Sequence, residues 1–222
     1  MVMRGAGLAL AVLLALPVVA EARPDTRPPA RPEVRASAPG QASAVAEAVI
    51  GAARAQVGQT VTYDPAYLRL AFPGGDPPRD RGVCTDVVIR ALRDGAGLDL
   101  QRAVNRDMAG NFASYPQSWG LKRPDSNIDH RRVPNLQKLL TRVGAKLPED
   151  VAFLPGDLVT SMLPGNLPHI MVVSDRAGRA GPLVIHNIGA GAREEDALRR
   201  YPLTGHYRLD GPALAKLRAL DR

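Results

Sequence analysis

The spacing of apolar residues changes once along this chain, and that change limits the fold more than any other feature. As far as residue 144, apolar side chains recur at the three- and four-residue intervals of amphipathic helices. From residue 157 onward they fall instead in short runs rich in Val and Ile, each bounded by Pro, Gly or Asp, which is the pattern of strands. Helices first and strands second predict an α+β fold, in which N-terminal helices pack on a small antiparallel sheet.

The bounds of the individual helices and strands follow from the same spacing and from the Gly and Pro residues that interrupt it. We expect helices over 45–57, 84–95, 99–112, 134–143 and 212–220, and strands over 157–162, 169–174, 183–188 and 204–209. A short helix is also expected over 64–70, because Asp64 can cap it and Pro65 suits a first helical turn. The charged segment 193–200 is interpreted as a helical turn.

The N-terminus has the layout of a secretory signal peptide. One basic residue, Arg4, precedes the uncharged run 8–20, and Ala20-Glu21-Ala22 then offers small side chains at the two positions that a signal peptidase reads. An uncleaved anchor helix is the alternative, but the run spans roughly 20 Å as a helix, short of a hydrocarbon core of about 30 Å. We therefore expect a signal peptide over 1–22, an exported protein (periplasmic or extracellular) and no stable membrane span.

A linker is expected between the signal peptide and the folded domain. Prolines and arginines are interleaved through 23–40, and proline at that density favours an extended chain over helix or sheet. The folded domain is then expected over 41–222. Because 45% of the 222 residues are apolar, the chain can form a packed core and is not wholly disordered.

The charge of the chain indicates an anionic partner. The formal net charge is +7, which favours acidic partners without identifying them, and a solvated surface of scattered arginines is the plain alternative. Nucleic acid is not expected as a partner, because the protein is predicted to be exported and only 4% of its residues are aromatic. A peptidoglycan stem peptide or another anionic envelope component fits the expected compartment.

The single cysteine, Cys84, is placed like a nucleophile. It follows a loop rich in Gly and Pro and begins the helix expected over 84–95, where the helix dipole and free backbone N–H groups favour a thiolate and could stabilise an oxyanion. The alternative is a small buried hydrophobic residue. One cysteine excludes an intrachain disulfide framework and any metal site built from several cysteines.

Two of the four histidines stand where a base and its orienting partner are needed. His169 opens one expected strand and His186 lies on the next, so the two rings could come within hydrogen-bonding reach if the strands pair. His169 would be the base and His186 would fix its tautomer. Asn187 is a rival for the second role, but strand alternation points it away from the face of His186. Each histidine alone could equally be structural.

A polar cluster stands in the long aperiodic segment 114–135, next to Trp119. Its members are Asp129, His130, Arg131 and Arg132. They could bind the carboxylates of a substrate, because arginine grips carboxylates in a bidentate way, or they could tie the loop to the domain. A metal site built from Asp129 and His130 with His169 or His186 is disfavoured by the spacing, so we expect no metal or other cofactor.

Several strings resemble the NlpC-type papain-like cysteine peptidases. These are Leu154-Pro155-Gly156-Asp157-Leu158-Val159, His169-Ile170-Met171-Val172-Val173 and Val184-Ile185-His186. The resemblance implies a papain-like fold with Cys84 as nucleophile, His169 as base and His186 as its partner. It also implies a supporting role near the oxyanion for Tyr63, which precedes Gly74-Gly75. The residues that flank the cysteine, Val83 and Thr85, depart from the pattern of that family.

A closer resemblance is to an exported bacterial family classed as a domain of unknown function. The blocks that carry it are Tyr63-Asp64-Pro65, Gly82-Val83-Cys84-Thr85-Asp86-Val87, Ile128-Asp129-His130-Arg131-Arg132-Val133-Pro134-Asn135-Leu136 and His186-Asn187-Ile188-Gly189. That family implies no activity. Two hypotheses follow: a thiol-dependent hydrolase that cleaves an amide bond in peptidoglycan, or a non-catalytic envelope-binding module on a peptidase-like fold.

Overall fold

The computed structural model describes residues 42–148 and 150–222. The expected signal peptide (1–22) and linker (23–40) lie outside the described residues. Within the described part of the chain, no helix combines the length and the apolar character needed to cross a membrane.

Five α-helices occur in the described residues. They are α1 (Ala44–Arg54), α2 (Cys84–Ala96), α3 (Leu100–Asn111), α4 (Val133–Arg142) and α5 (Gly211–Leu220), with 3-10 turns η1 (Phe112–Ser114) and η2 (Asp129–Arg131). Side-chain oxygens of Ser43 and Asp99 cap the first turns of α1 and α3, and Gly97 ends α2 in the left-handed conformation, with φ of 64°. Because these helix ends are marked by capping residues or glycine, the helices predicted from the spacing lie where the structure has them.

The strands form one five-stranded sheet and one small pair. The sheet contains β3 (Leu158–Leu163), β4 (Leu167–Ala177), β5 (Pro182–Asn187), β6 (Ala192–Glu195) and β7 (Leu203–Tyr207) in the order β6-β5-β4-β3-β7. Every neighbouring pair in it is antiparallel. The separate pair, β1 (Thr62–Tyr63) and β2 (Arg81–Gly82), is parallel. The predicted α+β class with an antiparallel sheet is therefore confirmed.

Two of the expected elements are wrong. Segment 193–200 is not a helical turn: its first residues belong to β6, which pairs with β5 at the edge of the sheet. Segment 64–70 is not a helix either. The guanidinium of Arg131 donates to the backbone carbonyls of Ala66, at 3.0 Å, and Asp64, at 3.3 Å, and so holds this stretch in an irregular path. A long-range contact thus overrides the local capping signal of Asp64.

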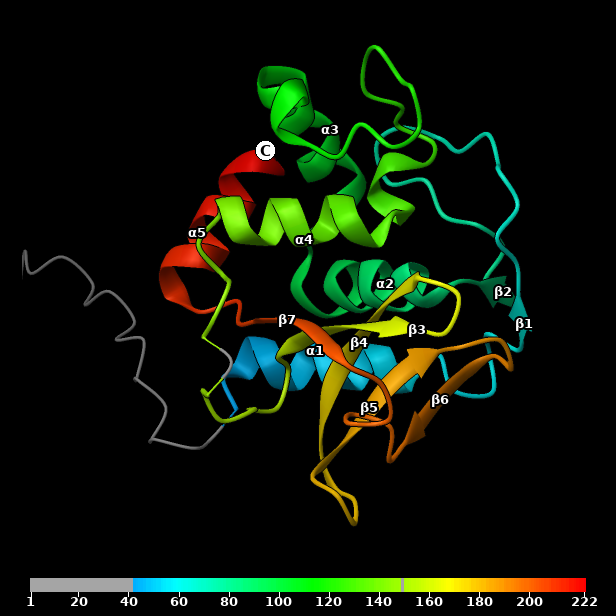
Figure 1. Cartoon of the computed structure of the whole chain (residues 1–222), viewed down its shortest axis with the longest axis vertical. Helices are drawn as coiled ribbons and strands as arrows, with labels where there is room; N and C mark the ends of the chain where they lie inside the picture. Colours follow the sequence, from blue (N-terminus) through cyan, green and yellow to red (C-terminus); the bar gives the residue numbers. More distant parts are fainter. Residues whose placement is uncertain (1–41, 149) are drawn as a thin grey trace, which may run out of the picture. The chain divides into compact units, whose positions relative to one another are not determined.

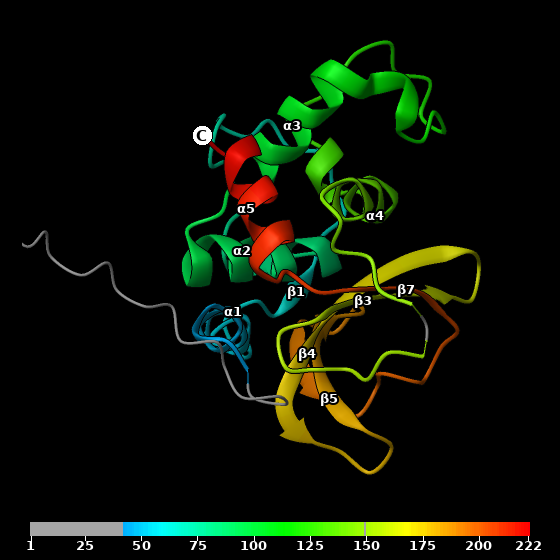
Figure 2. The same cartoon turned by 90° about the vertical axis from the view of Figure 1, so that its left-hand side faces the viewer.

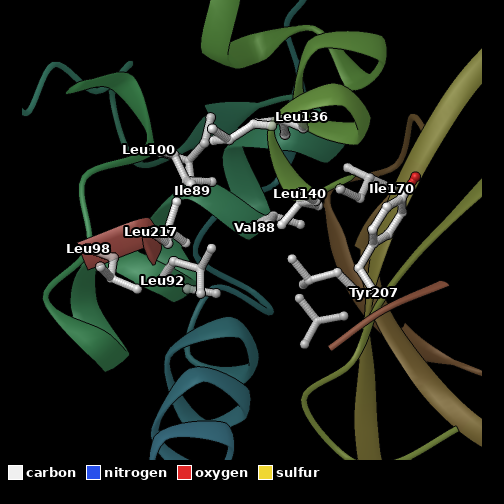
Figure 3. Close-up of a cluster of buried hydrophobic side chains, with 14 of the residues drawn as sticks. Val88, Ile89, Leu92, Leu98, Leu100, Leu136, Leu140, Ile170, Tyr207 and Leu217 are labelled. Carbon is white, nitrogen blue, oxygen red and sulfur yellow. The ribbon is translucent and has the colours of Figure 1, made fainter. Parts of the chain in front are cut away.

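The helices lie on one side of the sheet (Figures 1 and 2). Helices α1, α2 and α4 all pack against the central strand β4. The main core fills this layer, where side chains of α2, such as Val88 and Leu92, meet Leu140, Ile170 and Tyr207 (Figure 3). A smaller apolar cluster covers the other face of the sheet and includes Met171, Val173, Val184, Ala197 and Leu198. The sheet is therefore buried on both faces, which fixes the strand positions that carry the candidate site.

Candidate active site at the start of helix α2

Cys84 is the first residue of α2 and is only 5% exposed. Its sulfur lies against the backbone N–H of Ile170 on β4, the residue that follows His169. Burial, together with the nearby Asp86 carboxylate, raises the pKa of the thiol to about 11. The N–H groups of Ile170, Thr85 and Cys84 itself act in the opposite direction, because they favour the thiolate. The thiol therefore rests protonated near neutral pH, beside donors that could stabilise negative charge.

The backbone before Cys84 is fixed from three sides. The carbonyl of Gly82 accepts a hydrogen bond from the side-chain amide of Asn187, at 3.0 Å, and another from the backbone of Asp64, at 3.2 Å. The Asp86 carboxylate accepts from the backbone N–H of Val83 at 2.7 Å and so caps α2. A Cβ at Gly82 would stand 3.0 Å from both Cβ and Oδ2 of Asp86, so a larger residue there would press on the carboxylate that caps α2. The side chain of Asn187 thus hydrogen-bonds the backbone of Gly82 and of Gly189 and holds the cysteine loop.

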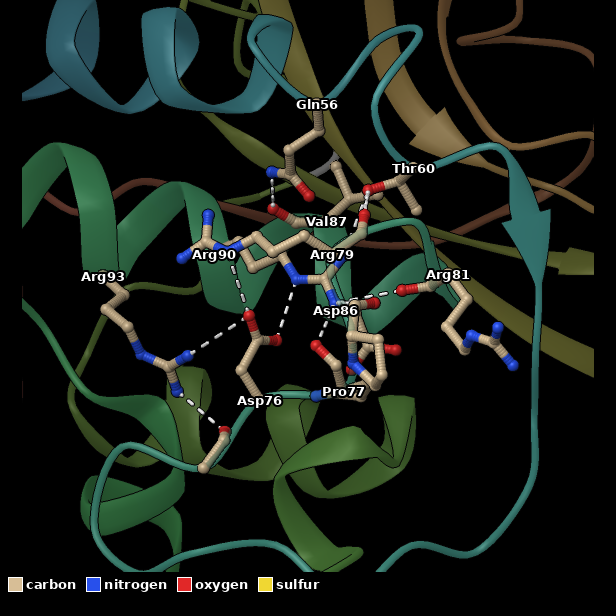
Figure 4. A network of polar contacts seen from close by, with 12 residues as sticks. Gln56, Thr60, Asp76, Pro77, Arg79, Arg81, Asp86, Val87, Arg90 and Arg93 are labelled. Atoms are coloured by element: carbon tan, nitrogen blue, oxygen red, sulfur yellow. Dashed lines mark hydrogen bonds and ion pairs between the residues drawn. The ribbon is translucent and has the colours of Figure 1, made fainter.

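Arg90, on α2, organises the loop that leads to Cys84 (Figure 4). Its side chain is 0% exposed. Nε donates to Asp76 at 2.8 Å and Nη1 donates to the hydroxyl of Thr60 at 3.1 Å. Nη2 donates to three backbone carbonyls of the loop, those of Pro77, Pro78 and Arg81, at 3.0 to 3.3 Å. Sequence analysis missed this residue, although one signal was present: Arg90 interrupts the otherwise apolar run 87–92.

His169 and His186 are hydrogen-bonded to each other. Nε2 of His169 lies 2.7 Å from Nδ1 of His186, across the neighbouring strands β4 and β5. Burial lowers the pKa of both rings, and that of His169, which His186 depresses further, falls to about 3. Both rings are therefore neutral near neutral pH. The arrangement of strands predicted from the sequence brings the two rings together.

Glu195 extends this pair into a chain of three side chains. Its Oε1 lies 3.0 Å from Nε2 of His186 and 3.2 Å from Nη1 of Arg200. Sequence analysis missed Glu195 because the charged segment that holds it was interpreted as a helical turn. As the last residue of β6, which pairs with β5, Glu195 instead comes beside His186.

The second ring nitrogen of His169, Nδ1, is not used in the hydrogen bond to His186. Within the described residues no hydrogen bond engages Nδ1, and this atom is not among the fully buried polar atoms that lack a partner. His169 as a whole is 3% exposed. A proton acceptor at this position would be free to serve an incoming group.

Tyr63 lies on β1, paired with Gly82 two residues before Cys84. Its side chain is 39% exposed. Partial burial and the negative charge of a Cys84 thiolate together raise the pKa of its hydroxyl to about 12. Tyr63 is thus a neutral hydroxyl donor close to the cysteine.

The polar cluster of segment 129–132 lies mostly inside the domain. Asp129, His130 and Arg131 are buried, and Arg131 forms a bidentate ion pair with Asp86, with both hydrogen bonds at 2.9 Å. Arg132 donates to Asp129 at 3.0 Å and stacks over the ring of Trp119, 4.0 Å from its centroid. These contacts favour the alternative in which the cluster secures the loop, and sequence analysis had no signal for the pairing of Arg131 with Asp86.

No group of three or more His, Cys, Asp and Glu side chains in the described part of the chain is arranged to hold a metal ion. A surface hollow of about 600 Å³ lies apart from the cysteine and is lined by Tyr67 and residues 120–127. The groups near this end of the sheet that can take part in nucleophilic and acid–base chemistry are the thiol of Cys84 and the hydrogen-bonded side chains of His169, His186 and Glu195.

The described residues form an α+β domain in which the cysteine that begins α2 lies against the backbone N–H of Ile170, the residue after His169, and His169, His186 and Glu195 form a hydrogen-bonded chain. The chain belongs to the family described as a domain of unknown function, DUF1287, which matches residues 50–209. It is also similar to the uncharacterized protein YijF of Escherichia coli (strain K12), with 58% identity over 167 residues that cover 72% of this chain and 80% of YijF. The predicted membership of a domain-of-unknown-function family is therefore confirmed.

Proposed function

We propose that the protein is an exported thiol-dependent hydrolase that cleaves an amide bond in cell-wall peptidoglycan. The observation that carries the proposal is the juxtaposition at Cys84: a helix-start thiol lies against the His169–Ile170 peptide, and His169 is hydrogen-bonded to His186. A nucleophile, a base and a group that orients the base are the minimum set for covalent amide hydrolysis. The proposed fold is papain-like, of the NlpC type, with the helices on one side of the antiparallel sheet.

In the proposed reaction the Cys84 sulfur attacks the substrate carbonyl carbon while its proton passes to Nδ1 of His169. The resting pair is neutral, because burial raises the pKa of the thiol and lowers that of the imidazole, so proton transfer accompanies attack. His169 then donates the proton to the amide nitrogen as the C–N bond breaks. Water hydrolyses the resulting thioester, again with His169 as the base, and restores the thiol.

The negative charge that develops on the carbonyl oxygen needs donors. The backbone N–H of Cys84 at the start of α2 is one, since this end of a helix carries unpaired N–H groups. The hydroxyl of Tyr63 is the second donor we propose, because it is neutral and lies within electrostatic range of the sulfur.

Peptidoglycan is proposed as the substrate from charge and compartment. The chain carries a net charge of +7 and begins with the pattern of a signal peptide, so it would meet the anionic stem peptides of the envelope. The test is digestion of purified sacculi by the mature protein, with the released fragments separated by chromatography and identified by mass. Cys84→Ser and Cys84→Ala should release nothing above the heat-inactivated protein. Equal release by wild type and Cys84→Ala would refute the proposal.

A non-catalytic envelope-binding module is the second candidate, and the burial of Cys84 favours it. A thiol that is 5% exposed, with its pKa raised to about 11, resembles a structural cysteine. The binding module predicts that wild type and Cys84→Ala sediment equally with sacculi and that neither releases fragments. Release of fragments by wild type alone would exclude it.

A further inference from the structure

His169, His186 and Glu195 form a hydrogen-bonded chain in which the position of the proton on one ring determines the position of the proton on the next ring. His169 Nε2 and His186 Nδ1 share one hydrogen bond of 2.7 Å, and His186 Nε2 and Glu195 Oε1 share another of 3.0 Å. His169 uses one ring nitrogen in these hydrogen bonds, and His186 uses both. Which atom donates and which accepts in each bond therefore depends on the group at the end, Glu195.

That group, Glu195, is ionised. Although burial raises the pKa of its carboxyl, the hydrogen bond from His186 and the charge of Arg200 outweigh burial, and the pKa lies below its ordinary value. A carboxylate has no proton to give and can only accept. The bond must therefore run from His186 Nε2–H to Glu195.

The direction of the second bond follows from the first. A neutral imidazole has one N–H and one lone pair, so His186, with its proton on Nε2, offers a lone pair at Nδ1. His169 must then donate its own Nε2–H to that lone pair. The lone pair of His169 is consequently left on Nδ1, the ring nitrogen that does not face His186.

We propose that the Glu195 carboxylate, through His186, sets the tautomer of His169 so that its Nδ1 is a proton acceptor. Glu195 is thus a positioning residue that acts through two rings. With the opposite tautomer His169 would present N–H at Nδ1 and could not take a proton from the thiol. The catalytic meaning of this arrangement rests on the proposed hydrolase function, but the tautomers themselves do not.

The first test is the nitrogen NMR spectrum of the histidine rings in the ¹⁵N-labelled protein near neutral pH. Protonated and unprotonated ring nitrogens give well-separated signals, and His130→Gln and His206→Gln remove the signals of the two other rings. We expect Nε2 to be protonated and Nδ1 to be unprotonated in both His169 and His186. A protonated Nδ1 at His169 would overturn the proposal, and this measurement on the wild type needs no variant at Glu195.

The second test changes the end of the chain. In Glu195→Gln the side chain can donate as well as accept. Both hydrogen bonds can then run in the opposite direction, with glutamine donating to His186 and His186 donating to His169, so the Nδ1–H form of His169 should appear. Glu195→Asp keeps an acceptor-only carboxylate and should retain the wild-type tautomers. Glu194→Gln is the matched control, because it removes the same charge one residue away, where the partners are Arg54 and Ser174. Unchanged tautomers in Glu195→Gln would overturn the proposal.

A kinetic measurement separates this proposal from the proposed function. If the protein cleaves sacculi, Glu195→Gln should lower kcat with little change in KM, by between ~10-fold and the ~10⁴-fold loss seen when a triad histidine takes the wrong tautomer. If the wild type shows the expected tautomers but releases nothing, the hydrolase function fails and the tautomer assignment stands. If the wild type cleaves while Glu195→Gln keeps full kcat, the role of Glu195 fails alone.

Discussion

Replacing Arg131 by Ala is expected to destabilise the domain strongly. The Arg131 and Asp86 side chains are each 1% exposed and are joined by two hydrogen bonds of 2.9 Å. Arg131 also donates to the backbone carbonyls of Ala66 and Asp64. The substitution would leave a buried carboxylate without its counter-charge, two residues from Cys84, and would release the loop after β1.

The burial of this ion pair determines how much stability the substitution should remove. Breaking a buried ion pair by removing one partner costs about 3 to 5 kcal/mol, because the remaining charge stays desolvated. In a domain of this size each kcal/mol lowers the unfolding midpoint by about 2 to 4 °C, so the expected fall in Tm is about 6 to 20 °C. The double variant Arg131→Met with Asp86→Leu should recover part of it, since neither charge is then left unpaired.

Thermal unfolding followed by circular dichroism measures this directly. Arg81→Ala is the control, because Arg81 is 43% exposed on its side chain and pairs with the exposed Asp80, so its loss should leave Tm nearly unchanged. A Tm for Arg131→Ala equal to that of wild type, together with lost turnover or lost binding of sacculi, would refute the structural role and restore the hypothesis that Arg131 binds a substrate carboxylate.

Four further outcomes are expected. Iodoacetamide should label Cys84 slowly at neutral pH in the folded protein and faster as pH approaches 11, because burial raises the pKa of the thiol; in urea labelling should follow its ordinary pKa of about 9. Burial also lowers the pKa of His130 to about 4, so the unfolded state binds the proton first as pH falls. The free energy of unfolding should therefore fall between about pH 6.5 and 4, and His130→Gln should reduce that slope by up to ~1.4 kcal/mol per pH unit in denaturant titrations. Asn187→Ala should lower the urea midpoint by an amount equivalent to about 1 to 3 kcal/mol, because the Gly82 carbonyl loses its side-chain donor. N-terminal sequencing of the exported protein should begin at Arg23, and a full-length product would refute the signal peptide.

The sequence predicted those elements whose ends carry their own signals. Asp99 caps α3 and Gly97 ends α2, so periodicity and capping agreed at both positions. His169 and His186 could be placed together because they stand on consecutive strands, and strands that follow one another often pair.

The failures all involve partners that are distant in sequence. Segment 64–70 carries a helix cap, but two of its backbone carbonyls accept hydrogen bonds from Arg131, which is far away in the sequence. Strand β6 is an edge strand with charged side chains, so no alternation marks it, and Glu195 was missed with it. Arg90 is a buried cation whose contacts are mostly backbone carbonyls, which no residue pattern records.

The network of Arg90 also determines which residues near Cys84 are open to change. Three of its bonds go to main-chain oxygens, which every amino acid possesses, so these bonds do not depend on side-chain type, although the rings of Pro77 and Pro78 also restrict the backbone of the loop. The exposed side chains of Asp80 and Arg81 can therefore change while the backbone that enters α2 keeps its bond to Arg90. A library that varies Asp80 and Arg81 and retains Arg90 and Asp76 should therefore contain many variants with the unfolding midpoint of the wild type.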